Sequence, residues 1–232
     1  MKKGISVVLL AYAEEHNLRI LIPEIEEKLR EIGEEWEIVV IDGPVAMDKS
    51  EEVCAGLGVR YYRQQNPGFA EAFKEGIRMA RYKTFLILDA DFSHDPVYIP
   101  KMYERFVEKR ADVVIGSRYV KGGRCVGWPF KRWFISRFGG LFIRLMLGVP
   151  VKDPTGGFKC FRRSALEFLG DFSRIRSFGY SFQMEMNFRM AKAGLKLKEI
   201  PITFTERRAG QSKITGSIAT ETLKMVWKLR FG

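Results

Sequence analysis

Short apolar runs alternate with helical patterns through the first half of this sequence, and this alternation constrains the fold more than any other feature. The runs are rich in β-branched residues, as in strands covered on both faces, and they lie at residues 5–10, 37–41, 59–62, 85–88 and 113–115. After Pro23, which suits a first helical turn, Ile25, Leu29 and Ile32 fall on one helical face. Further helical patterns cover residues 49–57, 69–79 and 98–107. Alternating strands and helices predict right-handed crossovers and a mostly parallel central sheet in an α/β fold.

Three aspartates follow two of the predicted strands at the point where each strand ends. Asp42 comes after the run at 37–41, and Asp89 and Asp91 come after the run at 85–88. Ligands of parallel sheets bind at the carboxyl ends of strands, so these side chains are expected at one edge. Asp89 and Asp91 are one residue apart and can share a hard divalent cation; the alternative is a structural capping role for the pair. A carboxylate at the end of a buried strand needs a positive partner, which favours a Mg²⁺ or Mn²⁺ site.

The charge of the chain is divided unevenly between its halves. Residues 1–116 contain 16 Lys and Arg against 21 Asp and Glu, a net charge of −5, whereas residues 117–232 contain 23 against 7, a net charge of +16. A basic half suits nucleic acid, anionic lipid headgroups or phosphorylated substrates, or it is simply a solvated surface. Nucleic acid is disfavoured, because the sequence contains no recognisable recognition helix or single-strand stacking module.

Length and cysteine content bound the class of protein. The 232 residues contain no linker rich in Pro, Gly or Ser, which predicts one large domain. No apolar run reaches the roughly 20 residues that a membrane-spanning helix requires. Three distant cysteines and two histidines indicate neither a zinc site nor a disulfide framework, so a reducing cytosolic setting is expected.

Several longer motifs are more specific than the Asp-x-Asp pair. They are LDADFSHDP at 88–96, GWPFKRWFISR at 127–137, DPTGGFKCFRR at 153–163, GYSFQMEMNFRMAKAG at 179–194 and ERRAGQSK at 206–213. In this order they resemble the family 2 glycosyltransferases of GT-A fold, and within them the dolichol-phosphate mannose synthases. The resemblance runs from about Ile5 to Lys213 and implies a Rossmann-like fold that binds a nucleotide-diphospho-sugar.

The resemblance also implies an activity. Such enzymes transfer a hexose from a nucleotide sugar, with GDP-mannose the expected donor, to the phosphate of dolichol or another polyprenyl lipid, and they invert the anomeric centre. An acceptor phosphate is already anionic at neutral pH, so no strong general base is needed, and His94 is expected to be structural. Alternatives are a UDP-glucose or UDP-GlcNAc donor, or a membrane-associated relative of low activity.

Site residues are carried over from the family motifs. Asp91 is expected to hold Mg²⁺ or Mn²⁺ directly, with Asp89 beside it reaching the ribose or a metal-bound water. Arg207 and Lys213 match positions near the diphosphate. The positions that hold the lipid phosphate in the family are occupied here by Arg118, Arg132 and Ser136.

The donor loops depart from the family pattern. The usual Pro-Thr-Tyr-Asn-Glu is LAYAE at 10–14, so Tyr12 and Glu14 match and are expected in the donor site together with Asp42. The usual Asp-Asp-Gly-Ser turn is replaced by DGPVAMDKS at 42–50, in which Gly43 stands in place of the second acid. The base and ribose pocket is therefore the part of the site that the resemblance defines least.

The remaining expectations concern membranes. We assign residues 1–215 to the catalytic domain and 216–232 to an amphipathic C-terminal helix at a membrane interface. Residues 131–147 mix Trp, Phe and Leu with Lys and Arg, which is typical of a helix in a headgroup layer, although an ordinary core helix fits equally well. The resemblance implies a cytoplasmic protein bound peripherally to the cytoplasmic face of a membrane.

Overall fold

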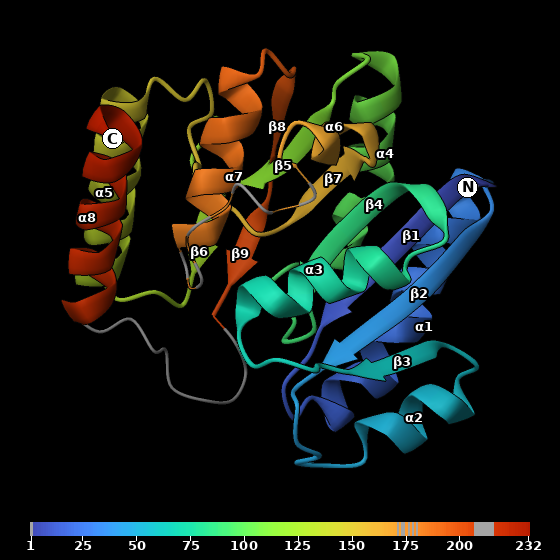
Figure 1. The fold of residues 1–232 in the computed structure, drawn as a ribbon. Coiled ribbons are helices and arrows are strands. Elements are labelled where there is room, and N and C mark those ends of the chain that lie inside the picture. The colour runs from blue at the N-terminus through green and yellow to red at the C-terminus, as the bar shows by residue number, and fades with distance from the viewer. Residues whose placement is uncertain are drawn as a thin grey trace.

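A seven-stranded sheet forms the centre of the computed structural model, which describes residues 2–232 except 171, 173, 174, 176, 178, 180 and 207–215 (Figure 1). The strand order is β3-β2-β1-β4-β7-β5-β8. Only β7 runs antiparallel to its neighbours β4 and β5. The predicted mostly parallel sheet is thus confirmed. The strands are β1 (Lys2–Leu10), β2 (Trp36–Asp42), β3 (Arg60–Arg63), β4 (Tyr82–Asp89), β5 (Val113–Ser117), β7 (Lys159–Arg162) and β8 (Leu197–Pro201).

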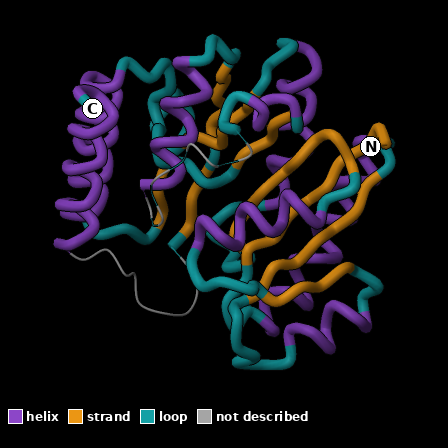
Figure 2. The backbone as a smooth tube through the Cα atoms, viewed as in Figure 1, coloured by secondary structure: helices purple, strands orange, loops and turns teal. Residues whose placement is uncertain are grey.

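Helices cover both faces of the sheet (Figure 2). On β1, Val7 and Leu9 point into one hydrophobic core, and Val8 and Leu10 point into the other, which explains why the run has no polar face. The first core is closed by α1 (Glu15–Ile32), α2 (Ser50–Gly56) and α4 (Ile99–Glu108), which follows the 3-10 turn η1 (Pro96–Tyr98). The second core is closed by α3 (Phe69–Met79), α6 (Ser164–Glu167) and α7 (Ser181–Lys192).

Pro23 lies inside α1, so the prediction that it occupies a first helical turn is wrong. The helix starts at Glu15, whose backbone N–H donates to Asp48 Oδ2 at 2.7 Å. The apolar stripe also begins before the proline, because Leu18 and Leu21 are fully buried. An interior proline costs ~3 kcal/mol, and complete burial of each large apolar side chain stabilises by ~1.5–3 kcal/mol. Burial therefore outweighs the lost backbone hydrogen bond.

The second half of the chain adds strands that the sequence patterns did not predict. β7 and β8 complete the main sheet, and β6 (Arg124–Val126) pairs in parallel with β9 (Thr203–Thr205) in a separate two-stranded sheet. β7 has the sequence KCFR, and its first residue, Lys159, is fully buried. A buried lysine in a central strand breaks the apolar pattern by which strands are recognised.

Helices α5 (Phe130–Leu147) and α8 (Gly216–Phe231) lie side by side at one end of the molecule, away from the main sheet (Figure 1). In α5 only Gly140, Ile143 and Leu147 are buried, so the alternative of an ordinary core helix for residues 131–147 is wrong. In the described part of the chain no helix is both long enough and apolar enough to cross a bilayer. The exposed large apolar residues of α5 are Phe130, Trp133, Phe134, Ile135, Phe138, Leu141, Phe142 and Leu145.

Candidate active site

The predicted carboxylates lie at the carboxyl edge of the main sheet. Asp89 ends β4 and pairs with Leu10 of β1, and Asp42 ends β2 on the other side of β1. Two strand spacings, roughly 10 Å, therefore separate the backbones of Asp42 and Asp89. Among the described residues no three His, Cys, Asp or Glu side chains form a cluster that could hold a metal ion. The edge brings the three aspartates to one side of the sheet without making them one ligand set.

Asp42 fixes the turn that follows β2. Its Oδ1 accepts a hydrogen bond from the backbone N–H of Gly43 at 2.8 Å, and its Oδ2 accepts one from the Tyr61 hydroxyl at 2.9 Å. Burial, with a further contribution from the Asp42 carboxylate, raises the pKa of Tyr61 to about 12, so the phenol remains a donor at neutral pH. The side chain of Asp42 is thereby held in one orientation at the base of the donor loop.

Asp89 and Asp91 experience different surroundings. The Asp89 side chain is one-third exposed, whereas Asp91 is buried and its Oδ1 accepts a hydrogen bond from Ser93 N–H at 3.0 Å. Phe92, which follows them, has φ +60°, a left-handed conformation that turns the chain sharply after Asp91. These two carboxylates supply the oxygen ligands that Mg²⁺ and Mn²⁺ prefer, and the remaining coordination positions of such an ion suit phosphate oxygens and water. The pair therefore fits a divalent ion.

His94 supports the loop that carries these carboxylates. Its ring packs against Phe158 and Phe204, with centroids 5.3 Å away in both cases. Its Nδ1 accepts a long hydrogen bond of 3.5 Å from Asp89 N–H and lies 3.8 Å from Asp89 Oδ2. Burial, only partly offset by Asp91, lowers the pKa of His94 to about 4. The imidazole is therefore neutral at physiological pH, in agreement with the expected structural role.

The departures in the donor loops are sterically linked. The ring of Tyr12, which is 60% exposed, lies so close to Gly43 that a Cβ at that glycine would be 2.8 Å from Tyr12 Cδ2. The missing second acid thus leaves room for this position of the tyrosine ring. Ala13 has φ +58°, a conformation that suits the asparagine usual in the family better than alanine. Glu14 ends the loop, and its Oε2 accepts a hydrogen bond from Asn17 Nδ2.

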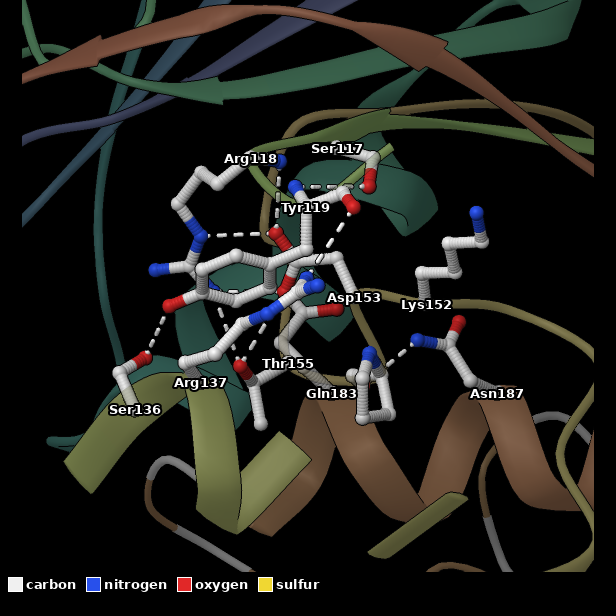
Figure 3. A network of polar contacts seen from close by, with 12 residues as sticks. Ser117, Arg118, Tyr119, Ser136, Arg137, Lys152, Asp153, Thr155, Gln183 and Asn187 are labelled. Atoms are coloured by element: carbon white, nitrogen blue, oxygen red, sulfur yellow. Dashed lines mark hydrogen bonds and ion pairs between the residues drawn. The ribbon is translucent and has the colours of Figure 1, made fainter. Parts of the chain in front are cut away.

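Arg118 forms a fork with a buried aspartate that the sequence analysis did not single out (Figure 3). Its Nε donates to Asp153 Oδ2 at 2.7 Å, its Nη2 donates to Asp153 Oδ1 at 2.6 Å, and Nη2 also donates to Thr155 Oγ1 at 2.9 Å. Burial alone would raise the pKa of Asp153, but the charge and hydrogen bonds of Arg118 outweigh it and hold that pKa below its usual value. The sequence contained one indication that Asp153 matters, because it is one of only seven acidic residues in the basic half, residues 117–232.

The other two predicted acceptor residues, Arg132 and Ser136, contact aromatic residues that Arg118 also contacts. The guanidinium carbon of Arg132 is 4.1 Å from the centre of the Trp128 ring, and that of Arg118 is 5.4 Å from it. Arg132 also forms an ion pair with Glu206. The Tyr119 hydroxyl donates to Ser136 Oγ at 2.6 Å. Arg118, Arg132 and Ser136 are thus brought together, whereas Arg207 and Lys213 lie outside the described residues.

A buried lysine and a buried glutamine, both missed from the sequence, lie beneath this region. Lys159 is fully buried, and its Nζ donates to Gly156 O and to Gln183 Oε1. Burial lowers the pKa of Lys159 to about 7, against the opposing attraction of Asp153. The lysine connects β7 to α7, and Gln183 is 3% exposed.

Comparison with known proteins gives the family. The family model described as glycosyl transferase family 2 matches residues 6–170. The chain belongs to glycosyl transferase family 2. It is a glycosyltransferase, as the motifs predicted.

Two curated relatives carry more specific names. The chain is 40% identical over 165 residues to an undecaprenyl-phosphate mannosyltransferase of Micrococcus luteus, covering 70% of this chain and 67% of that protein. It is 32% identical over 231 residues to a dolichol-phosphate mannosyltransferase of Pyrococcus furiosus, covering 97% of this chain and 63% of that protein. The chain therefore spans about two thirds of the length of these relatives.

The fold also matches a solved enzyme. Glucosyl-3-phosphoglycerate synthase from Mycobacterium tuberculosis, in complex with Mn²⁺, UDP and glucosyl-3-phosphoglycerate, superposes with a TM-score of 0.76 at 18% identity, over 98% of this chain and 80% of that chain. A second structure of the synthase contains Mg²⁺ and UDP, with a TM-score of 0.74 at 18% identity, over 98% and 79% of the two chains. The expected GT-A fold is confirmed.

Proposed function

We propose that this glycosyltransferase transfers mannose from GDP-mannose to the phosphate of dolichol or another polyprenyl lipid, with inversion of the anomeric centre. The observation that carries the proposal is the position of the basic cluster, formed by Arg118 and Arg132 with Ser136, beside the Asp-x-Asp loop. Phe204 contacts both, because its ring centre is 5.3 Å from that of His94 and 5.5 Å from the guanidinium carbon of Arg118. The names of the two curated mannosyltransferases support the same lipid-phosphate acceptor.

The donor end is assigned to the carboxyl edge of the sheet. Asp91 and Asp89 would hold a Mg²⁺ or Mn²⁺ ion, which when bound stabilises the negative charge that develops on the nucleotide diphosphate. Asp42 fixes the turn beneath the nucleoside, and Tyr12 and Glu14 border it. Arg207 and Lys213 are proposed near the diphosphate. The fold neighbour whose structure contains Mn²⁺ and UDP supports a metal-bound nucleotide.

The acceptor end is assigned to the basic cluster. Arg118 uses Nε and Nη2 on Asp153 and Thr155, and its Nη1 makes no hydrogen bond to a described residue. Asp153 therefore orients Arg118 while one edge of the guanidinium remains for a phosphate oxygen. Arg132 would exchange Glu206 for the phosphate, and Ser136 would add a hydroxyl donor. Because the phosphate is already ionised, the step needs no general base.

A peripheral membrane position completes the proposal. The exposed aromatic and aliphatic side chains of α5 and α8 would enter the headgroup layer on the cytoplasmic face of the membrane. The C-terminal helix at residues 216–232 would form part of this membrane face and lie outside the catalytic domain, residues 1–215. Arg132 and Ser136 belong to α5, so the same helix would place the acceptor site at the membrane surface.

The test of the donor end is Asp91→Asn. The amide keeps the size of the side chain and can still accept from Ser93 N–H, so the fold should persist, but a neutral ligand binds Mg²⁺ or Mn²⁺ poorly. Turnover and metal-dependent nucleotide binding are expected to fall by orders of magnitude. The matched control is Asp95→Asn in the same loop, where the exposed carboxylate only caps η1 through Val97 N–H.

Steady-state rates with a short polyprenyl phosphate, with and without chelator, check this expectation. Full activity of Asp91→Asn, or of the wild type in chelator, would contradict the metal assignment. The same assay, run with GDP-mannose, UDP-glucose and UDP-GlcNAc, decides the donor. Transfer from a UDP-sugar without transfer from GDP-mannose would replace the proposed donor and leave the acceptor in place.

A further inference from the structure

The amide of Gln183 is oriented by a hydrogen bond from Lys159. Lys159 Nζ donates a hydrogen bond to the carbonyl Oε1 of Gln183. The amide nitrogen Nε2 consequently points away from Lys159. This nitrogen is buried and has no hydrogen-bond partner among the described residues. Buried polar groups are nearly always hydrogen-bonded, so this amide nitrogen is a candidate donor to a bound ligand.

Gly157 lies beside this donor, and the space that a Cβ on it would occupy is called the recess. A Cβ built on Gly157 would lie 3.9 Å from Gln183 Nε2 and 3.6 Å from His94 Cε1, which are ordinary contact distances. Apart from the two chain neighbours of Gly157, no other described side chain approaches within 4 Å of that point. The preceding glycine differs, because a Cβ on Gly156 would lie 2.9 Å from Ile115 Cγ2. The recess thus has room for one small group between Gln183 and His94.

The recess adjoins the proposed donor end of the site. His94, which forms one wall, lies 3.8 Å from Asp89 Oδ2 and accepts from Asp89 N–H. The polar group that faces the recess from the other wall is the neutral amide NH₂ of Gln183. Such a donor matches the oxygen of a hydroxyl, whereas phosphate oxygens are better matched by the guanidinium groups around Trp128.

We propose that Gln183 determines sugar specificity by donating a hydrogen bond from Nε2 to one hydroxyl of the transferred hexose, which lies over Gly157, and that Lys159 positions this amide. The inference rests on the proposed glycosyl transfer and adds a sugar subsite to it. A buried donor that is left unpaired discriminates strongly against a sugar that lacks the matching hydroxyl.

The experiment compares Gln183→Met and Gly157→Ala with the wild type, using whichever sugar nucleotide the wild type transfers. Gln183→Met keeps the volume and removes the donor. Gly157→Ala adds one methyl group, which fits the free protein at 3.6–3.9 Å and fills the recess. Both variants should lower kcat/KM roughly 5- to 150-fold through weaker binding of the sugar nucleotide. The affinity for the free nucleotide diphosphate and the KM for the lipid phosphate should not change.

A series of deoxy-sugar nucleotides gives the second readout. In the wild type, removal of one particular hydroxyl from the sugar should lower kcat/KM by the same factor. In Gln183→Met, removal of that hydroxyl should have no further effect on kcat/KM. The matched control is Asn187→Leu, which removes another buried amide of α7, one that donates to Pro154 O at 2.8 Å. This change should lower stability without altering the ratio of sugar-nucleotide to nucleotide affinity.

Two results would overturn the inference. The first is that both Gln183→Met and Gly157→Ala discriminate between sugars as well as the wild type does. The second is that these variants differ from the wild type only in a higher KM for the lipid phosphate. If Gln183→Met does not fold, Gly157→Ala still decides the question. Either result is distinct from failure of the proposed function, which would appear as a wild type that transfers no sugar to a polyprenyl phosphate.

Discussion

Two of the four described non-glycine residues with a left-handed backbone lie in the loops of the substrate edge. Ala13, between Tyr12 and Glu14, and Phe92, directly after Asp91, both have left-handed φ values near +60°. This conformation costs an L-residue other than glycine roughly 1–2 kcal/mol. Such residues persist where the surroundings fix them, and they cluster at active sites. The strain here coincides with the loops to which the donor residues are assigned.

Ala13→Gly should therefore raise the free energy of unfolding by about 0.5–1 kcal/mol. Glycine removes the strain of roughly 1–2 kcal/mol. Its greater freedom in the unfolded chain offsets about 0.4–1 kcal/mol of this stabilisation. The control is Ala46→Gly, at an exposed position of the next loop whose φ is not positive. Glycine relieves no strain there, so it should only lower the free energy of unfolding. Urea unfolding measures both. Equal destabilisation by the two substitutions would show that Ala13 is not strained.

At the scale of elements, local patterns predicted those strands whose buried side chains are mainly apolar. The prediction of α3 at 69–79 matches its bounds, and β1, β2, β4 and β5 form around the predicted runs. β7 was missed because Lys159 finds its partner on α7, 24 residues later in the chain. The Asp153 carboxylate is likewise 35 residues from Arg118. Polar pairs of this kind are formed by the fold and leave no local periodicity in the sequence.

The buried lysine that joins β7 to α7 should make stability depend on pH. Burial lowers the pKa of Lys159 from its ordinary 10.5 to about 7. Between these values the unfolded chain binds more protons than the folded chain, so the free energy of unfolding rises with pH, by at most ~1.4 kcal/mol per pH unit for one group. Below pH 7 both states bind the proton and the full destabilising contribution is present.

Lys159→Met should remove this contribution and flatten the rise in unfolding free energy between pH 7.5 and about 9. Urea titrations at several pH values in this window measure the slope for the wild type and the variant. The exposed Lys83→Met on β4 is the control, and its slope should equal that of the wild type. A slope in Lys159→Met as steep as in the wild type would contradict the prediction.

At the scale of the whole molecule, charge and exposed apolar surface coincide. The basic second half contains α5, which has four Lys or Arg and no acidic residue, and α8, whose Leu223, Trp227 and Phe231 are more than half exposed. The sequence predicted the composition of this surface but not which side chains the fold would cover. Val226, for example, matches its neighbours in pattern and is almost completely buried against the core. A surface of exposed aromatics among cations matches an anionic headgroup layer.

The triple substitution Phe134→Ser, Phe138→Ser and Trp227→Ser should therefore weaken binding to vesicles of phosphatidylglycerol and phosphatidylcholine by at least roughly 100-fold, because each buried aromatic ring contributes about 2 kcal/mol. Vesicle cosedimentation measures this. Val107→Ser, an equally exposed apolar position on α4, is the control and should bind like the wild type.

The same triple variant separates membrane attachment from catalysis. Transfer to a short, water-soluble polyprenyl phosphate should stay near the wild-type rate, because Arg118, Arg132 and Ser136 are unchanged. Transfer to a long-chain acceptor in vesicles should fall together with vesicle binding. If the triple variant bound vesicles as tightly as the wild type does, α5 and α8 would not form the membrane contact. Loss of activity with both acceptors in a folded variant would instead mean that these aromatic side chains maintain the acceptor site itself, since only the attachment step distinguishes the two assays.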